Sequence, residues 1–181
     1  MLVLTAVGML LLMAQGSMPV TGAGEPLSIS IVEESATYGD ASSRFHVAVT
    51  NVSRKPVRIW EEWNSWGYYG LFFELTDKSG KQWKAFKKQT TWKRNFPSYK
   101  ELKPGGKLMF EVSIGDLNRW EGLPRPEKGS SIVMMQAVLE YQTDPDSLKL
   151  GVWTGRINSM AKDFTFYPQA PLHASPAPLH R

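Results

Sequence analysis

The chain has 181 residues, of which 42% are hydrophobic, and it carries a formal net charge of +4 at pH 7. This composition is that of one folded domain with appendages, and its small positive charge is unlike the clustered charge of a dedicated nucleic-acid-binding domain. Because the chain contains no cysteine, disulfides, thiolate metal sites, a cysteine nucleophile and a lipidated N-terminal cysteine are excluded.

The N-terminal residues have the pattern of an export signal. Residues 2–14 are a continuous apolar run with the length of a signal-peptide core, too short to span a bilayer comfortably, and small residues follow at 14–16 and 22–24. We expect a signal peptide over residues 1–24, although no Lys or Arg precedes the apolar run. The alternative is an uncleaved N-terminal anchor or a buried strand. The signal predicts a periplasmic or extracellular protein with no membrane span after cleavage.

The C-terminal residues 168–181, PQAPLHASPAPLHR, repeat Pro and Ala without an apolar period. Such a segment lacks the donors for a sheet, and we expect a Pro/Ala-rich flexible tail. Its two histidines, in APLH repeats, are interpreted as incidental rather than as metal ligands.

Between these ends, apolar residues recur at every second position. Three segments alternate clearly, at residues 27–34 (LSISIVEE), 44–51 (RFHVAVTN) and 107–114 (KLMFEVSI). This period is that of a strand with one buried and one wetter face. Residues 131–141 (SIVMMQAVLEY) are apolar on one parity and on most of the other. They predict a central strand that is covered on both faces.

Shorter segments of the same character complete the pattern, at residues 56–60, 70–76, 81–86, 152–158 and 163–167. Turn-forming residues separate the segments, and residues 76–82 (TDKSGKQ) have the Asp and Gly of a hairpin connection. No long helical pattern occurs outside the signal. We therefore predict one all-β domain over residues 25–167, an antiparallel sandwich of about seven to nine strands.

Two segments resemble parts of bacterial immunoglobulin-like and fibronectin-III-like β-sandwich domains. Residues 45–60 (FHVAVTNVSRKPVRIW) contain a strand that ends in V-x-N and a polar turn that leads to P-V, and residues 101–114 (ELKPGGKLMFEVSI) contain a Leu-x-Pro-Gly turn before a later strand. The resemblance covers most of residues 27–167, with the late strands included, and implies an immunoglobulin-like sandwich. The paired Cys of antibody domains is absent, and Leu108 stands where a tyrosine corner has an aromatic residue. Domains of this kind serve adhesion, carbohydrate binding, assembly or as spacers, so the resemblance implies no single function.

The sequence offers little for catalysis. His46 is the one histidine of residues 25–167, and its parity predicts an ordinary exposed strand residue. Glu61 and Glu62 are neighbours, whereas a glycosidase needs two carboxylates across a cleft. Residues 144–147 (DPDS) are interpreted as a Pro-containing turn, with weak calcium binding as a minor option. We expect no enzyme, no cofactor and no metal site.

A basic segment, residues 81–94 (KQWKAFKKQTTWKR), interleaves six cations with three aromatic residues and has no acid. Lys on an edge strand discourages sheet-to-sheet aggregation, and we interpret these cations first as solvated edge protection. An acidic glycan, an anionic lipid headgroup or an acidic partner is the second interpretation, and nucleic acid is not expected for an exported protein.

The densest aromatic segment is residues 59–70, IWEEWNSWGYYG. Strand parity places Ile59 inward and Trp60 on the other face, and the acids and Gly67 that follow predict one short helical turn with Trp63 and Trp66 on the same side. Packing against the domain is the favoured role of these rings. The alternatives are a carbohydrate-stacking platform over residues 60–69 and a protein–protein hot spot.

We therefore predict an exported, non-catalytic module that binds a partner or serves in assembly, with a carbohydrate-binding or accessory module as the alternative. The candidate binding residues are Trp60, Trp63, Trp66, Tyr68, Tyr69, Trp83, Lys84 and Trp92.

Overall fold

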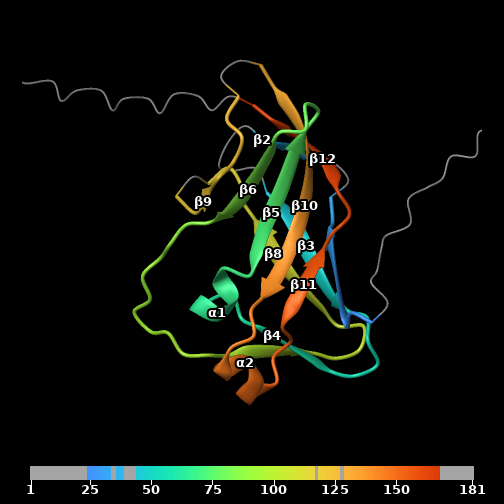
Figure 1. The fold of residues 1–181 in the computed structure, drawn as a ribbon, viewed down its shortest axis with the longest axis vertical. Coiled ribbons are helices and arrows are strands. Elements are labelled where there is room, and N and C mark those ends of the chain that lie inside the picture. Colours follow the sequence, from blue (N-terminus) through green and yellow to red (C-terminus); the bar gives the residue numbers. More distant parts are fainter. Residues whose placement is uncertain (1–23, 34–35, 39–43, 117, 127–128, 168–181) are drawn as a thin grey trace, which may run out of the picture.

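The computed structural model describes residues 24–33, 36–38, 44–116, 118–126 and 129–167 (Figure 1). The predicted tail at 168–181 and all of the predicted signal peptide except Gly24 lie outside these residues.

The described residues form an all-β fold with two short helices. The larger sheet has the order β2-β12-β10-β5-β6-β9, with β11 also paired to β10; its strands are β2 (Ala36–Tyr38), β5 (Leu71–Asp77), β6 (Gln82–Lys87), β9 (Trp120–Glu121), β10 (Ser131–Tyr141), β11 (Gly155–Asn158) and β12 (Lys162–Phe166). The smaller sheet has the order β1-β3-β8, from β1 (Leu27–Ile31), β3 (Phe45–Asn51) and β8 (Lys107–Val112). A two-stranded ribbon pairs β4 (Val57–Trp60) with β7 (Tyr99–Leu102).

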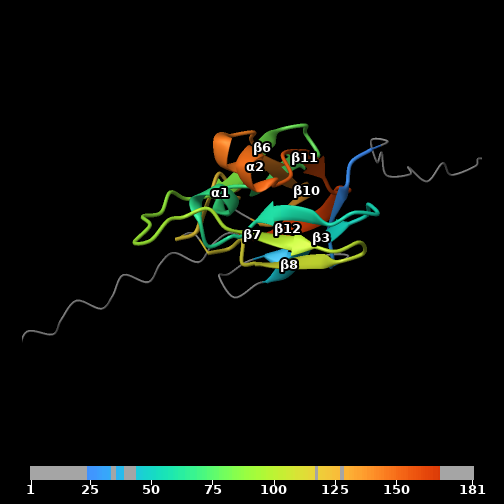
Figure 2. The same ribbon diagram turned by 90° about the horizontal axis from the view of Figure 1, so that it is seen from below.

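The larger and the smaller sheet face each other across one hydrophobic core. Phe45 of β3 contacts Phe73 of β5 and Phe164 of β12, with ring centroids 5.4 and 5.3 Å apart. Figure 2 shows β3 and β8 on one side of the molecule and β6, β10 and β11 on the other. The other face of the larger sheet is therefore turned away from this core.

The alternation read from the sequence is confirmed for β1, β3 and β8, whose inward residues are buried or half-buried. β10 is central, as predicted, because β5 pairs along one edge while β11 and β12 share the other. The expectation that both its faces are covered is wrong for its first half, where Ile132 and Met134 are exposed on the face turned away from the core. The hairpin at residues 76–82 is also confirmed, since the Asp77 carboxylate accepts hydrogen bonds from the backbone of Ser79 and Lys81.

The expected strand number is too low, since the described residues form twelve strands. The additional ones, β2, β7 and β9, have two to four residues each, too few for a period of two to stand out. All strand pairs are antiparallel except β2 with β12, which is parallel.

Two helices interrupt the strands, α1 (Ser65–Tyr68) and α2 (Pro145–Leu150). The turn expected at residues 144–147 is in fact the start of α2. Asp144 caps this helix by accepting a hydrogen bond from the Ser147 backbone at 2.7 Å, the Ser147 hydroxyl caps in return, and Gly151 ends the helix in a left-handed conformation. Neither helix is long and apolar enough to cross a membrane, among the residues that the structure describes.

Candidate functional site

The aromatic segment turns sharply between β4 and β5. Asn64 begins α1: its side-chain oxygen accepts from the Gly67 backbone at 3.0 Å, and its amide donates to the Ser98 carbonyl at 3.0 Å. The helical turn predicted here is confirmed, but Gly67 lies inside it rather than at its end. A Cβ on Gly67 would stand 2.2 Å from the Glu61 carbonyl oxygen, so glycine is needed for close backbone packing.

The structure separates the three tryptophans. Trp60 is 1% exposed, and Trp66 is half-buried beside it, with ring centroids 6.1 Å apart. Trp63 is 44% exposed and contacts Phe96 instead, at 4.8 Å. The expectation that Trp63 and Trp66 share one side is wrong, because Trp63 precedes Asn64, whose extended backbone redirects the chain. Trp60 and Ile59 are both buried although strand parity places them on opposite faces, so the favoured packing role is confirmed for Trp60.

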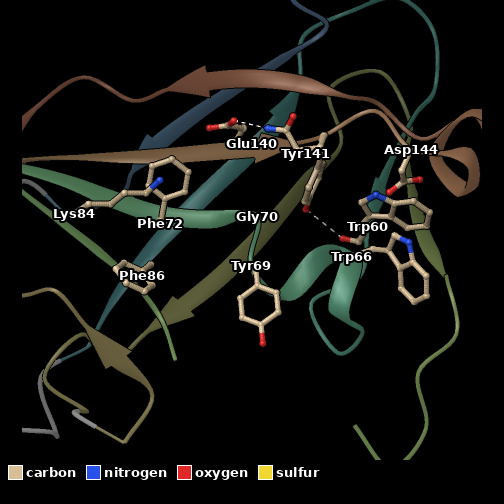
Figure 3. Close-up of a pocket in the computed structure, with 11 residues that line it drawn as sticks. Trp60, Trp66, Tyr69, Gly70, Phe72, Lys84, Phe86, Glu140, Tyr141 and Asp144 are labelled. Atoms are coloured by element: carbon tan, nitrogen blue, oxygen red, sulfur yellow. Dashed lines mark hydrogen bonds between the residues drawn. The ribbon is translucent and has the colours of Figure 1, made fainter. Parts of the chain in front are cut away.

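A pocket of about 480 Å³ opens between α1, β5, β6 and the end of β10 (Figure 3). Its aromatic walls are the rings of Trp60, Trp66, Tyr69, Phe72, Phe86 and Tyr141. Gly70 lies at its centre, and a Cβ there would come within 2.1 Å of the Tyr141 ring. The pocket therefore brings residues 60–86, which are close in sequence, against the distant end of β10 and the residues that follow it.

Polar groups line the rim of this pocket. Glu140 and Asp144 contribute carboxylates, and Gln142 contributes an amide that donates to Glu140 at 2.6 Å. Lys84 stands opposite in Figure 3, with its Nζ 3.8 Å above the centre of the Phe72 ring. The arrangement can hold an apolar side chain against the rings and hydrogen-bond the groups that flank it.

The eight candidate residues do not form one site. Four line the pocket, namely Trp60, Trp66, Tyr69 and Lys84. Tyr68 lies next to them in α1 and contacts Tyr69 and Trp92 edge-on, at 5.0 and 5.3 Å. Trp63 lies with Phe96, away from the pocket lining. Trp83 lines a second hollow of about 520 Å³ that also includes Glu74, Lys84 and Met134.

Seven of the eleven lining residues were not among the candidate binding residues, and three of these are Phe72, Phe86 and Glu140. Along β5, β6 and β10 they alternate with buried residues such as Phe73, Ala85 and Leu139. The hairpin predicted at residues 76–82 pairs β5 with β6, but the sequence holds no signal that brings β10 beside them.

An ion cluster around the buried Lys87 includes Glu62 of the aromatic segment. The Lys87 side chain is 1% exposed, its Nζ donates to Glu62 at 2.7 Å, and Arg119 donates to the same carboxylate. Rings of Tyr68 and Trp120 flank the ammonium at 4.8 and 5.8 Å. Burial lowers the pKa of Lys87, and the negative charge of Glu62 opposes that shift. Solvated edge protection is therefore wrong for Lys87, which takes an inward position of β6.

His46 is half-exposed and bound to one carboxylate. Its backbone N–H and its Nδ1 each lie 2.7 Å from a Glu33 oxygen. Burial raises the pKa of Glu33, but the hydrogen bonds from His46 outweigh it and hold that pKa below its usual range. Within the described part of the chain, no three His, Asp or Glu residues are grouped to hold a metal ion.

Comparisons with known proteins assign no family or function to the chain. No family model matches the chain, and no curated protein matches it. Among solved structures, the X-ray structure of Northeast Structural Genomics Consortium target SoR45 is similar over 86% of this chain and 93% of that chain, with 11% sequence identity and a TM-score of 0.26. A likeness of this size carries no statement about the function of the chain.

Proposed function

We propose that this chain is an exported, non-catalytic binding module whose aromatic pocket holds a short extended segment of a protein partner. The partner segment would place an apolar or aromatic side chain against Trp66, Tyr69 and Phe86, next to a Lys, Arg or other hydrogen-bond donor. Glu140 and Asp144 on the rim can accept these donors with their remaining capacity, since Glu140 also pairs with Arg156 at 3.4 Å and Asp144 also caps α2.

The orientation of the rings carries this proposal. A sugar ring stacks best on flat, exposed aromatic faces, but Trp60 is buried, and the Trp60 and Trp66 rings are inclined at 41°. Tyr69 is exposed, yet it stands at 89° to Tyr68. Rings that enclose a pocket at different angles suit a protein side chain, and Trp and Tyr dominate such contacts.

We further infer that the fold is an immunoglobulin-like β-sandwich. Two almost entirely antiparallel sheets around one core support this, as does the resemblance of residues 45–60 and 101–114. Export rests on the N-terminal signal pattern. A sandwich that presents its pocket on an outer face of one sheet fits a role in adhesion or assembly.

Peptide display on the full chain tests the pocket directly. Peptides selected on the wild type should bind at least about tenfold more weakly to Tyr69→Ala and Phe86→Ser, because both variants remove an exposed wall of the pocket. Met109→Ser is the matched control, since Met109 is exposed on the smaller sheet.

Titration calorimetry would give the affinities, and thermal unfolding would show that the variants are folded. Equal affinities for all four proteins would contradict the proposal. A parallel glycan array decides the alternative: glycans bound in place of peptides, and lost in the pocket variants, would favour the carbohydrate module.

A further inference from the structure

The loop between β6 and β7, residues 88–98, stands out from the body of the molecule in both Figure 1 and Figure 2. Its Phe96 is 54% exposed and packs edge-on against the exposed Trp63 of the aromatic segment. Neither ring lines either of the two pockets described above. Two large apolar side chains, one on the projecting loop and one beside it, are thus exposed together outside both of these pockets.

Hydrogen bonds hold this projection in place. The Ser65 backbone donates to the Asn95 side chain at 3.0 Å, and the Asn95 amide donates back to the Ser65 hydroxyl at 2.8 Å. The Ser98 hydroxyl donates to Glu61, and the same carboxylate accepts from the Trp63 indole at 2.9 Å. Because the loop is tied to α1 before Phe96 and to Glu61 after it, exposure of the two rings is a property of the folded structure.

The projection is also positively charged. Residues 88–98 include Lys88, Lys93 and Arg94 and no acid, and the last two are exposed within three residues of Phe96. Of the nearby acids, Glu62 is neutralised by Lys87 and Arg119, whereas Glu61 accepts hydrogen bonds from Ser98 and Trp63 and keeps its negative charge. Lys93 and Arg94 still outnumber this one carboxylate beside the two rings.

We propose that this surface, the aromatic tip formed by Trp63, Lys93, Arg94 and Phe96, binds the surface of an anionic lipid bilayer. Trp side chains favour the interface between headgroups and acyl chains, and Lys and Arg are attracted to anionic headgroups. A protruding tip with rings and cations matches a flat lipid surface, whereas a protein partner of this tip would have to supply its own hollow. None of the four residues of the aromatic tip lines the pocket, so the two proposed surfaces use different side chains.

Vesicle co-sedimentation of the full chain tests this proposal. We expect binding to vesicles that contain phosphatidylglycerol, little binding to pure phosphatidylcholine vesicles, and loss of binding at high salt. Lys93→Glu/Arg94→Glu should weaken partitioning by about 25-fold or more, since each cation near an anionic surface contributes roughly fivefold. Lys78→Glu/Lys107→Glu is the control with the same change in net charge, and both of its lysines are exposed outside the tip.

A second variant tests whether the Trp63 indole itself enters the bilayer. Trp63→Phe keeps an aromatic ring but removes the indole, so the shift of tryptophan emission to shorter wavelength that we expect on anionic vesicles should largely disappear. Equal sedimentation with neutral and anionic vesicles would overturn the proposal, as would equal losses in the tip and control double variants. Binding to soluble polyglutamate with the affinity seen for vesicles would also overturn it, in favour of an acidic protein partner.

Discussion

At the scale of single residues, two tryptophans of the aromatic segment differ strongly in burial: Trp60 is buried and Trp63 is exposed. Trp60→Ala should lower the free energy of unfolding by about 3–5 kcal/mol, because it empties a fully buried ring site in the core. Trp63→Ala should cost less than about 1 kcal/mol, since that ring is largely exposed. Urea unfolding of the full chain measures both. Similar losses in the two variants would contradict the placement of these rings.

Removal of the Glu62 side chain tests whether the ion pair with the buried Lys87 stabilises the fold more than a surface ion pair does. Glu62→Ala leaves the buried Lys87 ammonium without its carboxylate, and we expect a loss of about 3 kcal/mol in the free energy of unfolding. Glu101→Ala is the matched control, because Glu101 pairs with Arg58 at 3.3 Å on the surface and should cost no more than about 1 kcal/mol. If the two variants lose the same stability, the buried Lys87 does not depend on Glu62.

Tyr141 gives the chain a pH-dependent stability above neutral pH. Burial raises the pKa of Tyr141 above its usual range, and the negative charge of Glu62 adds to this. At alkaline pH the unfolded chain ionises this tyrosine near pH ~10 while the folded chain keeps it protonated, so stability falls by about 1.4 kcal/mol per pH unit above that point.

Tyr141→Phe removes this contribution. At pH 7 the variant should lose at most about 1 kcal/mol, because the hydroxyl makes one long hydrogen bond to the Trp60 carbonyl at 3.4 Å. The stability difference between wild type and variant should shrink, then reverse, as the pH of the urea titration rises past ~10. A difference that stays constant with pH would show that Tyr141 ionises equally in both states.

At the scale of elements, α1 depends on close approach of two backbone segments. Gly67→Ala should destabilise the chain by more than about 2 kcal/mol, because its Cβ would collide with the Glu61 backbone, which cannot move like a side-chain end. Gly80→Ala is the comparison: Gly80 has open space around it and a φ of 85°, so its cost is conformational strain of about 1 kcal/mol. Equal costs would argue against the packing role of Gly67.

The alternation of apolar residues predicts some strands of this fold and misses others. β1, β3 and β8 could be predicted because each buries one face against the facing sheet, which enforces a period of two. β7 could not, because Leu102 is its one fully buried residue and Lys100 and Glu101 are exposed. The acids and Gly67 predict the helical turn α1, but the residues act differently in the structure. Asn64 caps the helix, and Gly67 allows close packing against the Glu61 backbone.

At the scale of the whole molecule, the candidate site depends on topology that local patterns do not contain. Trp66 and Tyr69 could be chosen from the sequence because aromatic density singles out residues 59–70. Phe72 and Glu140 complete the pocket only because β5 and β10 pair over seven residues and place their outer faces side by side. The same holds for Lys87, whose partner Glu62 lies 25 residues earlier, so a long-range ion pair was mistaken for a solvated cation.

The central claim, that the pocket binds a protein segment, is tested most directly by NMR. The full chain has seven tryptophans, whose indole N–H signals can be assigned with Trp→Phe variants. A peptide selected on the wild-type protein should shift the Trp66 signal in a saturable way and leave Trp63 unchanged, because Trp66 lines the pocket and Trp63 does not. A saturable shift at Trp63 with none at Trp66, or binding that shifts neither signal, would contradict the claim.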